Sequence, residues 1–191
     1  GADQYAAESL KAAQDARAAL DAELAAQEPK WFKSYDKARE LAAAAKAAGD
    51  KAAADALERA LELAPDIHPA AYALGGLLAM QGDLEGAGRA FARFSSLTGT
   101  DGSVFRAYLA AVGDPSRRPE AVAMLRSPSF FGPVQGAELL AHLGEHEASL
   151  ALLEAAVQAR SPYLPWVNAM PQYDGIRENP RFQSILAWIE S

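Results

Sequence analysis

Residues 69–94, PAAYALGGLLAMQGDLEGAGRAFARF, hold two helical patterns separated by one break at residues 81–83. Apolar side chains recur at helical spacing on both sides of this break. A Gly-Gly pair at 75–76 and an Ala-Gly pair at 87–88 stand where two helices would pack closely. A hairpin of this kind leaves apolar surface that neighbouring hairpins must cover. The stretch therefore predicts an all-α chain of stacked helical hairpins.

The same stretch resembles a tetratricopeptide (TPR) repeat. The features that match the family are the Leu-Gly pair at 74–75, the Gly-Asp turn at 82–83, Ala87, and Phe91 four residues later. Phe94 and Gly99 stand where the family usually has Ala and Pro, so we expect looser packing against the next hairpin. The resemblance implies a right-handed TPR-like solenoid whose surface binds other proteins.

Composition excludes several classes of function. The chain has 191 residues and a formal net charge of −7, with a pI near 5.0, and it offers no basic stripe for nucleic acid. The sequence contains no run of eighteen apolar residues, so it predicts no membrane-spanning helix. The absence of cysteine excludes disulfides and thiol catalysis. The start at Gly1 fits a cloning scar or a processed N-terminus, and we expect a bacterial extracytoplasmic location, in the periplasm or cell envelope, over the cytoplasm.

The chain changes in composition near residue 56. All six lysines lie in the first 51 residues, and of eleven prolines only Pro29 does. We therefore predict an alanine-rich helical hairpin over residues 1–56, TPR-like repeats over 57–160 and a C-terminal cap over 161–191. We expect the three to stack as one continuous solenoid, with the boundary inside a helix.

The N-terminal part predicts a long-helix hairpin. Residues 3–27 form its first helix, which ends before Pro29, and a second helix starts near Lys30 with Trp31, Phe32 and Tyr35 on its apolar face. The Gly-Asp pair at 49–50 predicts a break or a kink, and the spacing of residues 34–67 predicts a degenerate repeat. The segment resembles alanine-rich two-helix segments of bacterial envelope proteins. Alanine favours helix but buries little area, so these helices need partners.

Further helices follow the core repeat. The apolar spacing predicts helices over residues 104–112, 119–125, 134–143 and 146–160, with the turn of the last hairpin at 144–145. A loop over residues 127–133 carries Phe130 and Phe131, which we expect to point inward. Four prolines between residues 162 and 180 prevent a continuous helix until Arg181.

The tail resembles the C-terminal end of TPR modules attached to bacterial signalling proteins, such as winged-helix regulators, nucleotide cyclases and kinases. The matching residues are the PYLPW segment at 162–166, Asp174 with Arg177, and the NPRF segment at 179–182. The resemblance implies a cap that closes the solenoid. It also suggests an alternative function, as the sensory or regulatory module of a larger signalling protein. We expect Arg177 and Arg181 to hold the tail through ion pairs and carbonyl hydrogen bonds.

No catalytic or cofactor-binding motif is present in the sequence. A metal site or small enzyme around His142 and His146 is a further alternative, but Gly144 predicts a turn that separates the two rings, and no third ligand stands at a suitable spacing. The glycine pairs lie inside predicted helices, where close packing of helices explains them. We therefore expect neither an enzyme nor a cofactor.

A partner-binding surface is expected on the first helices of the hairpins, which line the inner face in TPR proteins. The candidates, taken by spacing, are Tyr72, Gly76, Met80, Arg106, Glu138 and His142. Tyr and Met suit an apolar or extended peptide, and glycine permits close approach of a backbone. The predicted function is non-catalytic protein binding or scaffolding. Self-association through the alanine-rich helices is a further possibility.

Overall fold

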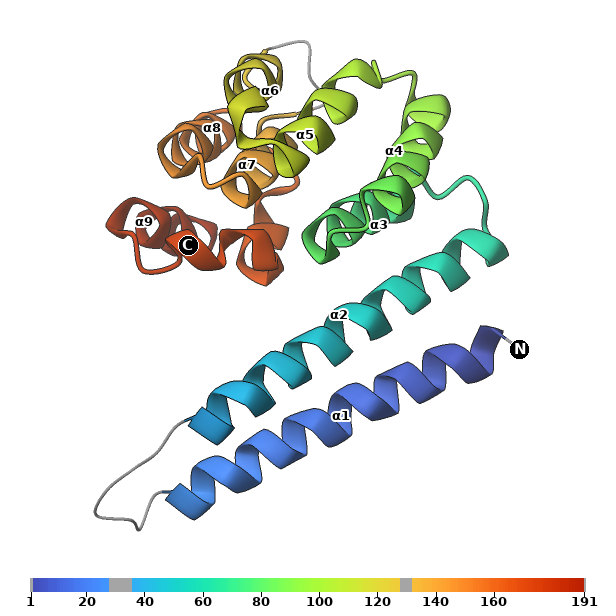
Figure 1. Ribbon diagram of the computed structural model, residues 1–191. Coiled ribbons are helices and arrows are strands. Elements are labelled where there is room, and N and C mark those ends of the chain that lie inside the picture. The colour runs from blue at the N-terminus through green and yellow to red at the C-terminus, as the bar shows by residue number, and fades with distance from the viewer. Residues whose placement is uncertain (1, 28–35, 128–131, 191) are drawn as a thin grey trace. The chain divides into compact units, whose positions relative to one another are not determined.

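The computed structural model describes residues 2–27, 36–127 and 132–190, and every regular element in these ranges is helical (Figure 1). The predicted all-α class is confirmed. The chain divides into two compact units, Gly1–Gln81 and Gly82–Ser191. The compositional boundary predicted near residue 56 falls inside a helix of the first unit. Within the described ranges, no helix is long and apolar enough to cross a membrane.

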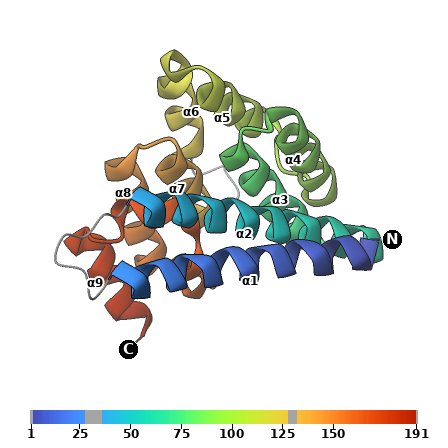
Figure 2. The same cartoon turned by 60° about the horizontal axis from the view of Figure 1, so that its bottom comes forward.

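The first unit contains a long antiparallel helix pair. Helix α1 (Ala2–Gln27) lies along α2 (Asp36–Leu63), as Figures 1 and 2 show, and α3 (His68–Gln81) packs on α2. The register of the pair is fixed by a polar contact, in which the Ser9 hydroxyl donates to the Asp55 carboxylate. This hydrogen bond holds the pKa of Asp55 below its usual value, and the ammonium of Lys51, 2.9 Å from Asp55 Oδ2, adds to the effect.

The predicted break at Gly49 is wrong, because α2 continues through this position as a single helix. Glycine costs a helix about 1 kcal/mol relative to alanine, a penalty that the alanine-rich flanks tolerate. Two lysine–aspartate pairs at i,i+4 spacing also span this part of the helix, Lys46 with Asp50 at 3.0 Å and Lys51 with Asp55. Residues 36–63 therefore form one helix and not the two helices of a repeat.

The second unit consists of successive short helices whose bounds agree with the predicted ones within about two residues at most ends. Sequential helices contact one another: α4 with α5, α5 with α6, α6 with α7, α7 with α8, and α8 with α9. The elements are α4 (Leu84–Thr98), α5 (Ser103–Gly113), η1 (Pro115–Arg117), α6 (Arg118–Leu125), α7 (Pro133–His142), α8 (His146–Gln158), η2 (Leu164–Ala169), η3 (Pro171–Ile176) and α9 (Pro180–Ile189).

Turn residues explain where these helices end. Gly82, Gly99 and Gly144 have φ values of +83°, +73° and +79°, a backbone region that glycine enters without steric cost. Asp83 then caps α4, since its carboxylate accepts the Gly86 amide at 2.8 Å. Asn179 caps α9 in the same way, with its side-chain oxygen 2.9 Å from the Arg181 amide. The predicted turns at 82–83 and 144–145 are confirmed.

The core of the second unit has an aromatic part and an aliphatic part. Phe91 stacks on Phe105 with ring centroids 4.4 Å apart, and Phe94 and Tyr108 meet these rings edge-on. The second part is mostly aliphatic, with the rings of Tyr173 and Phe182 among its side chains, and it joins α7 and α8 to the tail. Its buried members are Val134, Ala137, Ala141, Leu150, Leu153, Ala156, Leu164, Val167, Tyr173, Ile176, Phe182 and Ile185. The predicted core positions Trp31, Phe32, Tyr35, Phe130 and Phe131 lie outside the described residues.

Candidate functional site

The predicted partner-binding residues fall in both units. Tyr72, Gly76 and Met80 lie on α3, where Tyr72 is only 8 % exposed, Gly76 is buried and Met80 is half-buried. The face of α3 that was predicted to bind a partner is therefore largely covered. In the second unit Arg106 lies on α5 and is exposed, and its Nη1 adjoins Gly102. Arg106 is two residues from the buried Tyr108, so the two side chains lie on nearly opposite sides of α5.

The structure brings Glu138 and His142 together on adjacent turns of α7, where both belong to a buried polar network. The Tyr108 hydroxyl and His142 Nδ1 form a hydrogen bond between α5 and α7. Gln172 of η3 donates from Nε2 to Glu138 Oε1 at 2.8 Å. Glu138 is only 3 % exposed, so its carboxylate depends on such donors in place of water. These contacts join α5, α7 and η3 side by side.

Two buried tyrosines stay protonated beside Glu138. Burial and the Glu138 carboxylate together raise the pKa of Tyr108 and of Tyr173 far above the usual value. Tyr173 uses its proton to donate to the Val134 carbonyl at 3.1 Å. The Ser149 hydroxyl donates to the Ala137 carbonyl at 2.7 Å from the facing side of α8. The hydrogen bonds of this network therefore connect α7 to α5, α8 and η3.

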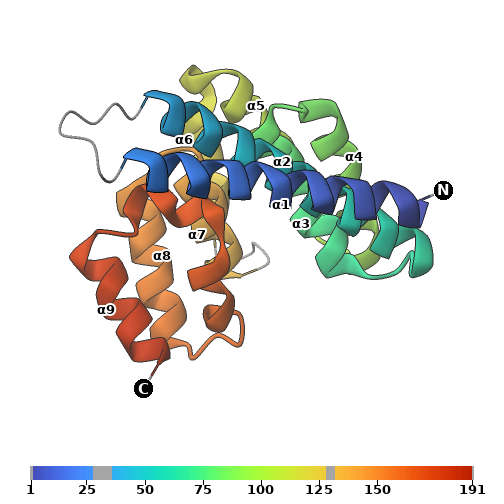
Figure 3. The same ribbon diagram turned by 90° about the horizontal axis from the view of Figure 1, so that it is seen from below.

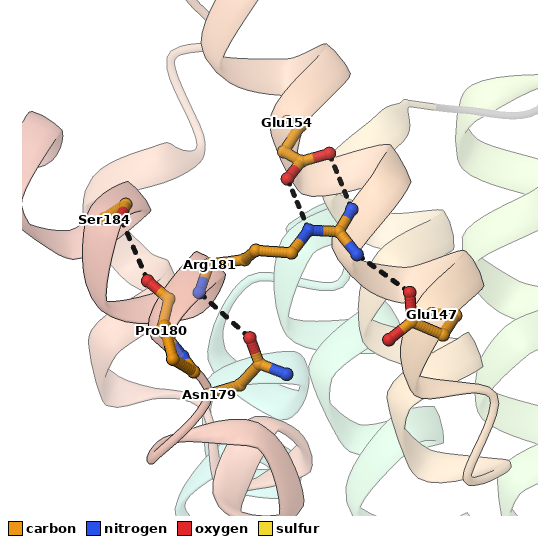
Figure 4. A network of polar contacts seen from close by, with 6 residues as sticks. All are labelled: Glu147, Glu154, Asn179, Pro180, Arg181 and Ser184. Atoms are coloured by element: carbon orange, nitrogen blue, oxygen red, sulfur yellow. Dashed lines mark hydrogen bonds and ion pairs between the residues drawn. The ribbon is translucent and has the colours of Figure 1, made fainter.

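A second network attaches the last helix to α8 (Figure 4). The Arg181 guanidinium forms a bidentate pair with Glu154, with Nε–Oε1 and Nη2–Oε2 distances of 2.7 Å each. Its Nη1 reaches Glu147 Oε2 at 2.8 Å. Hydrogen bonding to Arg181 lowers the pKa of Glu154, and hydrogen bonding to Glu154 raises the pKa of Arg181. Planar bidentate pairs of this kind fix geometry as well as charge.

Arg177 organises the two short 3-10 helices of the tail. Its Nε lies 2.7 Å from Asp174 Oδ1, and its guanidinium donates to the carbonyls of Asn168 at 2.9 Å and Met170 at 3.2 Å. These contacts agree with the role that the sequence predicted for Asp174 and Arg177. Prolines interrupt the backbone hydrogen bonding of this segment. The arginine adds donors to its carbonyls, including that of Met170, which also accepts the Tyr173 amide at 3.3 Å.

An open groove lies between α8 and α9, which run side by side (Figure 3). Its volume is about 330 Å³. Both apolar and polar side chains line it: Glu154, Val157, Gln158, Arg181, Ser184, Ile185 and Trp188. The Trp188 side chain is 43 % exposed. We call this feature the C-terminal groove.

The two histidines of the metal hypothesis lie on different helices, as the sequence predicted. His142 is the last residue of α7 and His146 is the first of α8. His142 Nδ1 is engaged by Tyr108, and the His146 ring adjoins Gly175. In the part of the chain that the structure describes, no group of three or more His, Cys, Asp or Glu residues is placed to hold a metal ion.

Comparisons with protein-family models, with curated proteins and with solved structures find no match to this chain.

His142 predicts a pH dependence of stability. Burial lowers the pKa of His142 below 6.5, so the unfolded chain binds the proton first as the pH falls. The neutral His142 ring makes its full contribution to stability above pH 6.5. This contribution is lost as the pH falls toward the pKa of His142 in the folded chain. The loss should be small, because solvent screens the charge on a half-buried ring.

Urea unfolding at pH 7.5 and pH 5.5 measures this difference. His142→Gln keeps a hydrogen-bonding group beside Tyr108 and should unfold with less change between the two pH values. An equal change in both proteins would contradict the assignment to His142.

Proposed function

We propose that the chain is a non-catalytic, TPR-like scaffold that binds a partner protein. The observation that carries this proposal is that three side-chain contacts of the second unit join residues separated by the same number of positions. Tyr108 bonds to His142, Gln172 to Glu138, and Arg181 to Glu147, and each of these pairs is separated by 34 positions. A separation of 34 residues is the repeat length of TPR proteins.

The positions of these pairs are consistent with repeat stacking. The first two pairs join first helices of successive hairpins (α5 with α7, and α7 with η3), and the third joins second helices (α8 with α9). Equivalent positions of adjacent repeats lie side by side in a solenoid, because each repeat contacts only its neighbours. The period therefore supports a TPR-like arrangement of α5 to α9, with η2 and η3 in place of a regular first helix.

The C-terminal groove is the surface that best fits a partner. A groove between two packed helices with apolar side chains in its lining can accept a third helix, whose side chains enter the groove as in other helix-in-groove complexes. Val157, Ile185 and Trp188 provide the apolar contact, and tryptophan is the residue type most enriched at binding hot spots. We therefore propose an amphipathic helix of a partner protein as the ligand.

Selection from a displayed library of random 15-residue peptides tests this function. We expect peptides with apolar residues at i, i+3, i+4 and i+7 to be enriched on the full chain. Ser184→Arg places a long side chain in the groove and should weaken binding at least about tenfold. Ala187→Arg, an exposed position on the same helix outside the groove lining, is the matched control and should bind like the wild type.

The other outcomes are also decisive. Equal binding by Ser184→Arg and Ala187→Arg would exclude the C-terminal groove as the peptide-binding site. If Arg106→Ala alone lost binding, the ligand would bind the inner face predicted from the sequence. If no peptide is enriched on the wild-type chain, the proposed function is contradicted.

A further inference from the structure

The two helices that form the C-terminal groove carry an excess of negative charge. Residues 145–160 and 178–190, which comprise α8, α9 and their ends, contain five glutamates and two arginines, a formal net charge of −3. Arg181 is the only arginine or lysine within the helices themselves, and it lines the groove. A partner that docks in the groove therefore meets more carboxylates than guanidinium groups.

The excess lies at the end of the groove where the two helices begin. Glu145 and Glu147 stand at the start of α8, and Glu178 stands just before α9. At the other end the charges balance, because Arg160 follows α8 and Glu190 follows α9. The groove therefore has one acidic end and one end without net charge.

Arg181 does not neutralise the two carboxylates that it contacts at this acidic end. Its guanidinium donates to both oxygens of Glu154 and to Oε2 of Glu147, as Figure 4 shows. Two negative charges thus share one positive charge, and the Glu147 side chain is 83 % exposed. The Glu147 carboxylate is open to a cationic side chain from outside the chain.

The helices α8 and α9 run in the same direction. Arg181 in the first turn of α9 meets Glu147 in the first turn of α8, and Trp188 in the last turn of α9 lines the groove together with Val157 from the last turn of α8. The positive ends of both macrodipoles therefore lie beside Glu147, and the negative ends lie beside Trp188. These dipoles favour a third helix that runs antiparallel to both.

We propose that the helix bound in the C-terminal groove runs antiparallel to α8 and α9 and carries lysine or arginine in its last turns. This inference rests on the proposed binding of a helix in that groove. Antiparallel docking brings the C-terminal end of the ligand to Glu147, and basic residues at this end also interact favourably with the dipole of the ligand helix itself. Charge and direction therefore select the same ligand.

The lining residues also define the spacing of the charge. Trp188 and Arg181 are seven positions apart on α9, about 10 Å, which is the length that apolar residues at i, i+3, i+4 and i+7 cover. Val157 and Glu147 are ten positions apart on α8, about 15 Å. A basic residue about ten positions after the apolar residue that packs at Trp188 therefore reaches Glu147.

A displayed library of 15-residue peptides tests this inference. Leucine is fixed at positions 3, 6, 7 and 10 of the peptide, and all other positions are random. On the wild-type chain we expect lysine and arginine to be enriched at positions 13 to 15 at least about threefold over the unselected library, and not at positions 1 and 2.

A charge-removing variant tests the role of Glu147. Glu147→Gln keeps an oxygen for Arg181 and should weaken the most enriched peptide about two- to fivefold in fluorescence anisotropy, the range expected for an exposed ion pair. Glu85→Gln is the matched control, because Glu85 is also an exposed glutamate that accepts an arginine, Arg89, but lies on α4. It changes the net charge equally and should leave binding unchanged.

The remaining outcomes separate this inference from the proposed function. Equal weakening by Glu147→Gln and Glu85→Gln would show a general attraction by net charge and would overturn the inference. Basic residues enriched at positions 1 and 2, or at no position, would overturn it as well. In each of these cases, peptides that bind the wild type but not Ser184→Arg would still support the groove as a helix-binding site. If no peptide is captured at all, the proposed function itself fails, and this inference fails with it.

Discussion

Removal of residues 161–191 should prevent the second unit from folding cooperatively. Six side chains of this tail are at most 4 % exposed and belong to the same cluster as α7 and α8: Leu164, Val167, Tyr173, Ile176, Phe182 and Ile185. Burial of each contributes about 1.5–3 kcal/mol, and whole domains are stable by only about 5–15 kcal/mol. The deletion also exposes the apolar faces of α7 and α8 to water, so we expect aggregation or loss of a sharp melting transition.

A point substitution measures the same contribution in a chain that keeps its length. Phe182 is fully buried on α9, and Phe182→Ala should lower the free energy of unfolding by about 3–5 kcal/mol in urea titrations. Trp166 belongs to the same tail but is 62 % exposed, so Trp166→Ala is the control and should change stability far less. A truncated chain that remains monomeric and melts like the wild type would contradict the structural role and make the tail a binding element.

The turns of the second unit were predictable because local and tertiary preferences agree there. At Gly82 a glycine with positive φ is followed by Asp83, whose carboxylate caps α4, and apolar patterns on both sides favour a fold-back. Gly49 is also followed by an aspartate, yet α2 is unbroken. There the flanks are alanine-rich, and Asp50 pairs with Lys46 one turn earlier inside the helix. The same dipeptide therefore lies inside a helix at residues 49–50, where the flanks are alanine-rich, and in a turn at residues 82–83.

The polar networks were only partly predictable. Glu138 and His142 were singled out by their position on a first helix, but their partners Tyr108 and Gln172 stand 34 residues away, and only the packing of α7 against α5 and η3 brings them together. A search for polar residues 34 positions apart would have been the available signal. Arg177 and Asp174, three residues apart, were predictable because their contact is local. The burial of Tyr72 depends on tertiary packing, which helical periodicity does not reveal.

Proline at position 56 should destabilise the first unit by about 3 kcal/mol or more. Ala56 lies in the interior of α2 and is exposed, so the substitution removes no buried side chain. Proline lacks the amide that bonds to the carbonyl four residues earlier, and its ring clashes with that carbonyl. It also disfavours helix at Asp55, which would move this carboxylate away from the Ser9 hydroxyl that fixes the α1–α2 register.

Hydrogen exchange followed by mass spectrometry measures the loss in each unit separately. Ala56→Gly is the matched control, with an expected cost of about 1 kcal/mol, because glycine keeps the amide and adds no ring. If Ala56→Pro loses no more protection over residues 36–63 than the glycine variant, α2 is not the continuous helix that its i,i+4 pairs indicate. The sequence also predicts that the parts of the chain before and after residue 56 unfold together as one stack, in which case amides of α7 and α8 should exchange faster in the proline variant. Exchange that changes only in the first unit would contradict this cooperative unfolding.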